Sequence, residues 1–142
     1  MDSNPAVARF VGGKTVGNVE KCRGIMAFVQ DQYALFGMGR WSVLLRETGE
    51  FIGWAGLKRM LGNNINSQSG FVDIGYRFQE QHWGRGYATE AARACLQGGF
   101  EKMRLPEICA MVKVENGASR WVLQKIGLQE GNEFDFEVER CC

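Results

Sequence analysis

Hydrophobic residues recur every three or four positions in the first third of the chain, which is the period of an amphipathic helix. Asn18 can cap this helix, and the pattern runs to about Phe36, where Gly37 and Gly39 end it. The recurring residues form a single apolar stripe, through which we expect the helix to pack on the core: Cys22, Ile25, Met26, Val29, Tyr33 and Phe36.

Three other segments are also expected to be helical. Residues 5–11 form a short helix that ends at a glycine pair. A longer helix runs from about residue 86 to residue 103, with small residues early in it, and Pro106 bars its continuation. Asn116 can cap a last helix that continues through Lys125.

Apolar and polar residues alternate between these helices, as they do in β-strands. Residues 41–45 and 51–57 flank a Thr-Gly turn and predict a hairpin, and residues 71–78 predict a third strand. Residues 107–114 and 128–139 are expected to be two further strands. The order α-α-β-β-β-α-β-α-β predicts an α/β (α+β) protein, in which helices pack on one mixed sheet.

Length and charge narrow the class of protein. At 142 residues the chain fits one domain, which we place at residues 1–142. Lys and Arg number 17 and Asp and Glu 16, so the net charge of +1 offers no long-range field for nucleic acid or an anionic membrane. No apolar run is long enough to span a membrane, and no signal peptide is visible. We therefore expect a cytoplasmic protein with neither kind of partner.

The five cysteines and the single His82 do not form a metal-binding pattern. Reduced thiols fit their odd number and their spacing best, and no metal cofactor is expected. Cys22, Cys95 and Cys109 lie among apolar neighbours, so we expect small core residues rather than catalytic nucleophiles.

A turn with two glycines joins the strand at 71–78 to the helix that starts near residue 86. This glycine turn consists of residues 83–86, with the sequence Trp-Gly-Arg-Gly. Glycines allow a ligand to approach the backbone, and the first N–H groups of the helix favour an anion together with its positive dipole end. The chain lacks the Gly-Lys-Ser/Thr ending of a P-loop and the G-x-G-x-x-G dinucleotide fingerprint. The turn therefore predicts a phosphate cradle of another kind.

Blocks spread along nearly the whole chain resemble, in order, the GNAT N-acetyltransferase superfamily and within it the RimJ/RimL-like branch. The resemblance implies the GNAT acyl-CoA N-acyltransferase fold, a mixed, mostly antiparallel sheet flanked by helices, which here would lack the usual first and last strands. The blocks are PAVARFVGG from Pro5, GRWSV from Gly39, TGEFIG from Thr48, DIGY from Asp73, WGRGYATEA from Trp83, NGASR from Asn116 and KIGL from Lys125.

The same resemblance implies a function. It indicates an enzyme that moves an acetyl group from acetyl-CoA to a primary amine, on a protein N-terminus or a small molecule, by direct attack in a ternary complex. The alternative is an acyl-CoA-binding or oligomerisation module without competent catalysis. Missing outer strands would leave sheet edges and apolar surface uncovered, from which we expect a homodimer.

The acyl-CoA signature of the family fits this chain in two registers, residues 81–86 and residues 83–88. Loop length favours the second, in which Trp83 replaces Gln or Arg. The pyrophosphate would then be held mainly by main-chain N–H groups of residues 84–88. Asn116 corresponds to the family residue that contacts the pantetheine arm, and it can equally be a helix cap. The implied cofactor-binding set is Tyr76, Arg77, Phe78, Trp83, Gly84, Arg85, Gly86, Tyr87, Ala88 and Asn116.

The resemblance also implies catalytic residues. Ser119 corresponds to a serine proposed to assist the thiolate leaving group in this branch, although an ordinary first-turn serine would look the same in sequence. More typical members carry a tyrosine acid seven residues after Asn116, where this chain has Leu123.

Attack by an amine needs a base that works near neutral pH, and partly buried carboxylates can serve. One candidate is Asp73, and another is Glu137 or Glu139 on the last expected strand. Each of these can equally be a solvated charge on a strand face. Weaker alternatives are Tyr33, Tyr76 and His82.

Overall fold

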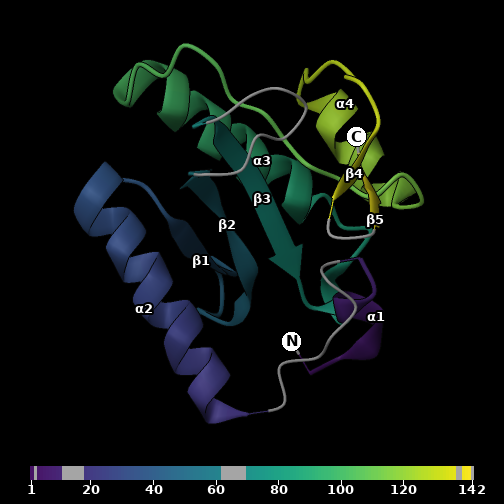
Figure 1. The fold of residues 1–142 in the computed structure, drawn as a ribbon. Helices are drawn as coiled ribbons and strands as arrows, with labels where there is room; N and C mark the ends of the chain where they lie inside the picture. The colour runs from purple at the N-terminus through teal and green to yellow at the C-terminus, as the bar shows by residue number, and fades with distance from the viewer. Residues whose placement is uncertain (2, 11–17, 62–69, 137–138, 142) are drawn as a thin grey trace.

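The computed structural model describes residues 1, 3–10, 18–61, 70–136 and 139–141 (Figure 1). A three-stranded sheet lies at its centre, and a separate two-stranded hairpin lies near the C-terminus. The elements in chain order are α1 (Pro5–Ala8), α2 (Val19–Phe36), β1 (Arg40–Leu44), β2 (Phe51–Arg59), β3 (Val72–Phe78), the 3₁₀ turn η1 (Glu80–His82), α3 (Tyr87–Gln97), the π-helical turn η2 (Gly98–Lys102), α4 (Gly117–Lys125), β4 (Phe134–Phe136) and β5 (Glu139–Cys141).

Strands β1, β2 and β3 pair in that order, and both pairings are antiparallel. The expected hairpin is thus confirmed, and Trp54 of β2 lies opposite Arg77 of β3. Because side chains alternate between the faces of a strand, one face of the sheet carries Trp54 and Lys58 and the other carries Ala55 and Leu57.

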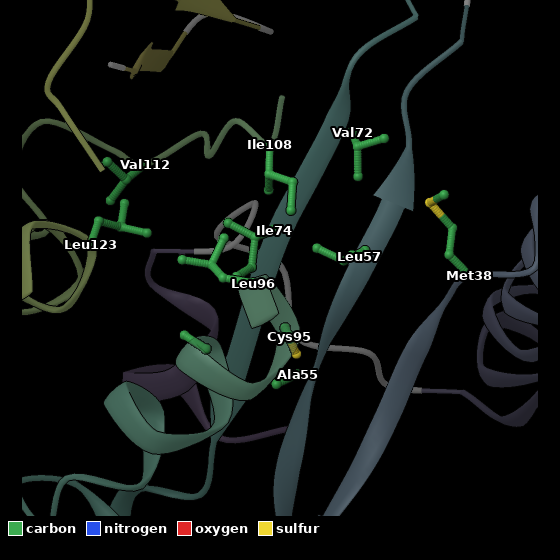
Figure 2. Close-up of a cluster of buried hydrophobic side chains, with 11 residues drawn as sticks. Met38, Ala55, Leu57, Val72, Ile74, Cys95, Leu96, Ile108, Val112 and Leu123 are labelled. Atoms are coloured by element: carbon green, nitrogen blue, oxygen red, sulfur yellow. The ribbon is translucent and has the colours of Figure 1, made fainter. Parts of the chain in front are cut away.

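The face that carries Leu57 packs on α3 and forms the core (Figure 2). The helix expected near residues 86–103 is found as α3 followed by η2. Gly99 of η2 lets this helix approach closely, since a Cβ there would lie 2.6 Å from Ile108 Cδ1 and 3.0 Å from Leu57 Cδ1. The buried cluster consists of Met38, Ala55, Leu57, Val72, Ile74, Ala92, Cys95, Leu96, Ile108, Val112 and Leu123.

Helix α2 begins and ends where the sequence predicts. Asn18 Oδ1 accepts the N–H of Lys21 at 2.9 Å, and the C-cap residue after Phe36 is a glycine with a φ of 65°. The expectation that the apolar stripe packs on the core is wrong for the first half of the helix, where Ile25 and Met26 are exposed.

Hydrogen bonds from the second half of α2 hold the helix on the sheet instead. Gln32 Nε2 donates to Arg59 O at 3.4 Å, and the N–H of Arg59 donates to Gln32 Oε1 at 2.9 Å. The Tyr33 hydroxyl donates to Arg40 O at 3.1 Å. Because the anchors lie in the second half, the first half of α2 extends past the strands (Figure 1).

The cysteines expected in the core differ in their surroundings. Cys95 is buried and Cys109 is half-buried, but Cys22 is exposed because it lies on the first half of α2. The core assignment of Cys22 is therefore wrong.

The strand expected at residues 107–114 is reduced to a single parallel bridge between Cys109 and Asp73 of β3. Two backbone hydrogen bonds of 2.8 Å join Cys109 to the residues on either side of Asp73. In a longer parallel ladder the N–H of Met111 would bond to the backbone of β3. It donates instead to Asp73 Oδ1 at 3.3 Å, so the pairing ends at this bridge.

The single strand expected over residues 128–139 is also wrong. Residues 128–133 contain no strand, and β4 and β5 form an antiparallel hairpin with Asp135 opposite Arg140. This hairpin is not part of the β1-β2-β3 sheet. Because β4 and β5 run antiparallel, the alternating pattern is divided between two short strands.

Replacing Gly99 by alanine should lower the free energy of unfolding by about 1–3 kcal/mol, because the new Cβ would overlap Ile108 and Leu57 in the core. Urea titration measures the loss. Gly98→Ala is the matched control, since a Cβ at that neighbouring position meets no atom within 4 Å. It should leave stability unchanged or raise it by up to about 1 kcal/mol. Equal losses in the two variants would contradict the packing role of Gly99.

Candidate functional site

A cleft of about 1010 Å³ lies along the edge of β3, beyond the bridge between Asp73 and Cys109. Both faces of β3 line it, with Tyr76 and Phe78 on the core face and Asp73 and Arg77 on the face toward α2. The glycine turn and α4 line the cleft next to the core face of β3, α2 lines it from the other face, and α1 also contributes lining residues. A space of this size at the open edge of a sheet can hold a substrate and a cofactor.

A second hollow of about 500 Å³ lies between residues 107–112, α4 and residues 128–132. None of the residues predicted for the site lines it. We therefore take the larger cleft as the candidate site.

The glycine turn has a backbone conformation that glycine adopts readily. Gly84 has a φ of 73°, and Gly86, the N-cap of α3, has a φ of 84°. A Cβ at either position would meet no atom within 4 Å, so the space in front of the turn is open. The first N–H groups of α3 have no partner within the helix and can bind an anion there. Trp83 Nε1 donates to Phe78 O at 2.9 Å and holds the turn against the end of β3.

Thr89, in the first turn of α3, is a cleft residue absent from the sequence-based set. Its side chain is buried, and Oγ1 has no hydrogen-bond partner in the part of the chain that the structure describes. A buried hydroxyl without a partner costs free energy, and a ligand bound at the glycine turn would supply one. The signal in the sequence is its place three residues after Gly86, on the first turn of the helix.

Tyr76 and Ser119 meet where β3 faces α4. The Tyr76 hydroxyl lies 2.9 Å from Ser119 Oγ and donates to Ser119 O at 3.1 Å. Asn116, the N-cap of α4, accepts the N–H of Ser119 at 3.1 Å and so fixes the serine. Burial raises the pKa of Tyr76 to about 12, against the opposing effect of the Ser119 hydrogen bond. The hydroxyl therefore keeps its proton near neutral pH and is a hydrogen-bond donor rather than a base.

Asp73 is buried in an ion pair on the face toward α2. Arg40 Nη2 donates to Asp73 Oδ2 at 2.8 Å, and the same guanidinium donates to Gly56 O. Burial raises the pKa of Asp73 above its usual value, and the charges of Arg40 and Lys58 oppose that rise. The carboxylate is therefore a desolvated group, held in one position at the floor of the cleft.

The weaker base candidates have structural partners. His82 is buried, with Nε2 3.3 Å from Glu50 Oε1 and the ring edge-on to Tyr87 at a centroid distance of 6.1 Å. The Tyr33 hydroxyl donates to Arg40 O, and burial raises the pKa of Tyr33. His82 thus supports the start of the glycine turn, and Tyr33 ties α2 to β1.

The structure brings most of the predicted site residues to this cleft. Arg85 is exposed and does not line it, and Glu137 lies outside the described residues. Glu139 belongs to β5, whose backbone pairs with β4. The predicted residues that line the cleft are Asp73, Tyr76, Arg77, Phe78, Trp83, Gly84, Gly86, Tyr87, Ala88, Asn116 and Ser119.

The described residues offer little support for metal, membrane or thiol chemistry. Within the described ranges, no group of three or more His, Cys, Asp or Glu residues could hold a metal ion. None of the helices described is long and apolar enough to cross a membrane. Burial and the neighbouring Glu107 raise the pKa of the Cys109 thiol to about 11, so it stays protonated and is a poor nucleophile.

Comparison with known proteins identifies the family. The acetyltransferase (GNAT) domain family matches residues 1–129. The chain belongs to the GNAT acetyltransferase family. The superfamily and fold expected from the sequence are thus confirmed, while the RimJ/RimL-like branch stays a prediction.

Several relatives of this GNAT protein come from bacteria. A Bacillus licheniformis protein described as the uncharacterized N-acetyltransferase p20 is 31% identical over 136 residues, which are 95% of this chain and 74% of that protein. YkkB of Bacillus subtilis is 40% identical over 93 residues, so the match spans 66% of this chain and 52% of YkkB. The crystal structure of an acetyltransferase from Agrobacterium tumefaciens has a TM-score of 0.76 at 29% identity, over 98% of this chain and 77% of that one.

Replacing Gly75 by alanine should break the pair between Arg40 and Asp73, because a Cβ at Gly75 would lie 2.6 Å from Arg40 Nη2. A buried charge left without its partner destabilises strongly, so urea titration should show a loss of about 3–5 kcal/mol. In an Arg40→Met background, which already lacks the guanidinium, the same glycine change should cost much less. Equal costs in the two backgrounds would show that Gly75 does not act through Arg40.

Proposed function

We propose that this GNAT protein is an N-acetyltransferase that moves the acetyl group of acetyl-CoA to a primary amine, by direct attack in a ternary complex. The observation that carries the proposal is that both faces of β3 line one cleft. Acetyl-CoA can enter along the glycine turn and α4, and the amine along the face toward α2. Two substrates that enter on opposite faces meet at the edge of β3, which supplies the proximity that direct transfer needs.

The glycine turn is the proposed site for the phosphates of CoA. The pyrophosphate would accept hydrogen bonds from main-chain N–H groups of residues 84–88, at the positive end of α3. The buried hydroxyl of Thr89 would gain a partner on the same turn. Asn116, at the start of α4, would contact the pantetheine arm.

The transfer step uses groups at the edge of β3. The amine nitrogen attacks the thioester carbonyl, an N–C bond forms, the C–S bond breaks, and the nitrogen loses the proton that the thiolate finally gains. We assign the base to Asp73, because burial raises its pKa, with Glu137 as the alternative. Ser119 would donate a hydrogen bond to the departing thiolate, and Tyr76 would orient that hydroxyl from 2.9 Å away.

One observation favours a second candidate, an acyl-CoA-binding module without competent catalysis. Both oxygens of Asp73 already accept hydrogen bonds, one from Arg40 and one from the N–H of Met111. Thiol release from acetyl-CoA in the presence of amines separates the two candidates. A homodimer stays a prediction, for which β1 is the relevant edge because its described partner is β2 alone.

CoA should bind at the glycine turn, and Gly86→Asp should abolish binding because it places a side chain and a negative charge where the pyrophosphate lies. Calorimetric titration measures the affinity, and CoA should raise the melting temperature with the logarithm of its excess. Gly37→Asp is the control, since its φ of 65° and its open surroundings match those of Gly86 at a position outside the cleft. Folded protein that binds no CoA would refute the cofactor site.

Tyr76→Phe and Ser119→Ala should each lower kcat about 100-fold while the Kd for CoA stays nearly unchanged. The double variant should lose little more, because the two hydroxyls form one pair. The rate of CoA release with a panel of amines measures both. Since the pKa of Tyr76 is raised to about 12, its protonated form persists, and the wild-type rate should show no alkaline loss from this group until the pH approaches that value. Losses that multiply in the double variant would contradict a shared role.

A further inference from the structure

The sheet face toward α2 carries charged and aromatic side chains that line the cleft. Ser42, Trp54 and Arg77 form one row across β1, β2 and β3, and Lys58 lies opposite Asp73 in another row. In the proposed function the acceptor amine enters on this face. The charge and shape of this face therefore determine which amines can bind.

Among the described residues, this face offers no free negative charge to an acceptor. Asp73 is the sole acidic residue among the described residues that line the cleft, and Arg40 already balances its charge at 2.8 Å. Of the residues that the structure does not describe, 11–17 and 62–69 contain neither Asp nor Glu, and the acidic ones are Asp2 and Glu137. A second ammonium group on the acceptor would thus lose water without gaining a carboxylate, which is unfavourable.

Lys58 offers a positive charge instead. It is half-buried in β2, and it has no ion-pair partner among the residues described. Its Nζ lies 5.9 Å from the centroid of the Phe28 ring on α2. Burial lowers the pKa of Lys58, against the opposing charge of Asp73, so a bound anion would stabilise the ammonium form.

Trp54 adds a flat apolar surface beside this charge. The guanidinium carbons of Arg40 and Arg77 lie 5.1 Å and 5.3 Å from the centroid of its ring. Across the cleft, α2 presents Met26 and Phe28, both of them exposed. The face thus combines aromatic walls with positive potential.

We propose that the acceptor is an amine that also carries a carboxylate, such as a free amino acid or a short peptide with a free C-terminus, and that Lys58 binds this carboxylate. Trp54 and Phe28 contact the apolar part of the acceptor while its amine reaches the edge of β3. The inference rests on the proposed function, because it assumes that the amine enters on the face toward α2. Polyamines, with several ammonium groups, are poor acceptors.

Matched acceptors test the proposal. Glycyl-phenylalanine and glycyl-phenylalaninamide present the same amine and differ in the C-terminal charge, and phenylalanine shortens the span between amine and carboxylate. We expect kcat/KM for CoA release to be about 10- to 100-fold higher for the acid than for the amide, the size of a hydrogen bond to a charged group. Spermidine should be slower than either. Whichever of phenylalanine and glycyl-phenylalanine reacts faster shows whether a single amino acid or a peptide spans the site.

Variants of Lys58 assign the effect to this residue. Lys58→Met should lower kcat/KM for the acid about 10- to 100-fold and change the value for the amide less than about twofold, while Lys58→Arg should restore part of the preference. Lys102→Met is the control, because Lys102 is exposed on η2 and outside the cleft. It should leave both values unchanged.

A second readout works without turnover. With CoA bound, glycyl-phenylalanine should raise the melting temperature of the wild type more than its amide does, and Lys58→Met should remove that difference. The inference would be overturned if the amide or spermidine gave the same kcat/KM and the same rise in melting temperature as the acid. It would also be overturned if Lys58→Met changed the values for the acid and the amide equally. Amides acetylated at good rates would leave the proposed function standing, whereas CoA that binds without any amine being acetylated would refute the proposed activity.

Discussion

The hydrogen bond from the N–H of Met111 to the carboxylate of Asp73 is the contact on which the cleft depends. In a longer parallel ladder this N–H would donate to the backbone of β3. Because it donates to the Asp73 side chain, the strand pairing stops at the bridge to Cys109. Arg40 of β1 holds the same carboxylate from the other side. One buried side chain thus joins β1, β3 and the segment after α3, and it leaves the edge of β3 open to ligands.

The open edge divides the cleft into two sides with different chemistry. On one side, the glycine turn presents main-chain donors and open space, which suit phosphate groups. On the other side, Trp54 and Lys58 present an aromatic ring and a cation beside the neutralised pair of Arg40 and Asp73. Tyr76 belongs to β3 and reaches Ser119 of α4 at the boundary, where a reacting carbonyl could contact groups from both sides.

Helix α2 shows that a pattern typical of burial can serve a binding site. Its second half is fixed to the sheet by Gln32 and Tyr33 through hydrogen bonds to the backbone. Its first half keeps Ile25 and Met26 exposed, and both line the cleft. Apolar side chains in this position are exposed to water in the free protein, and a ligand that enters the cleft would bury them.

Features set by neighbours in the chain could be read from the sequence. Asn18 and Asn116 cap their helices, and the glycine turn opens α3, because each depends on a few adjacent residues. A role for Ser119 in assisting the leaving group was implied by the family resemblance, but its contact with Tyr76 joins positions 43 residues apart and depends on the fold.

What only the tertiary structure decided depends on such long-range contacts. Local alternation predicted a continuous strand at 107–114, and nothing nearby in sequence showed that a carboxylate 38 residues earlier would take the N–H of Met111. In the same way, periodicity shows that α2 has an apolar stripe, but the anchors at Gln32 and Tyr33 decide which half of it is buried. Local sequence therefore determined the elements and the glycine turn, whereas the cleft and its charge balance arose when distant side chains met in the folded chain.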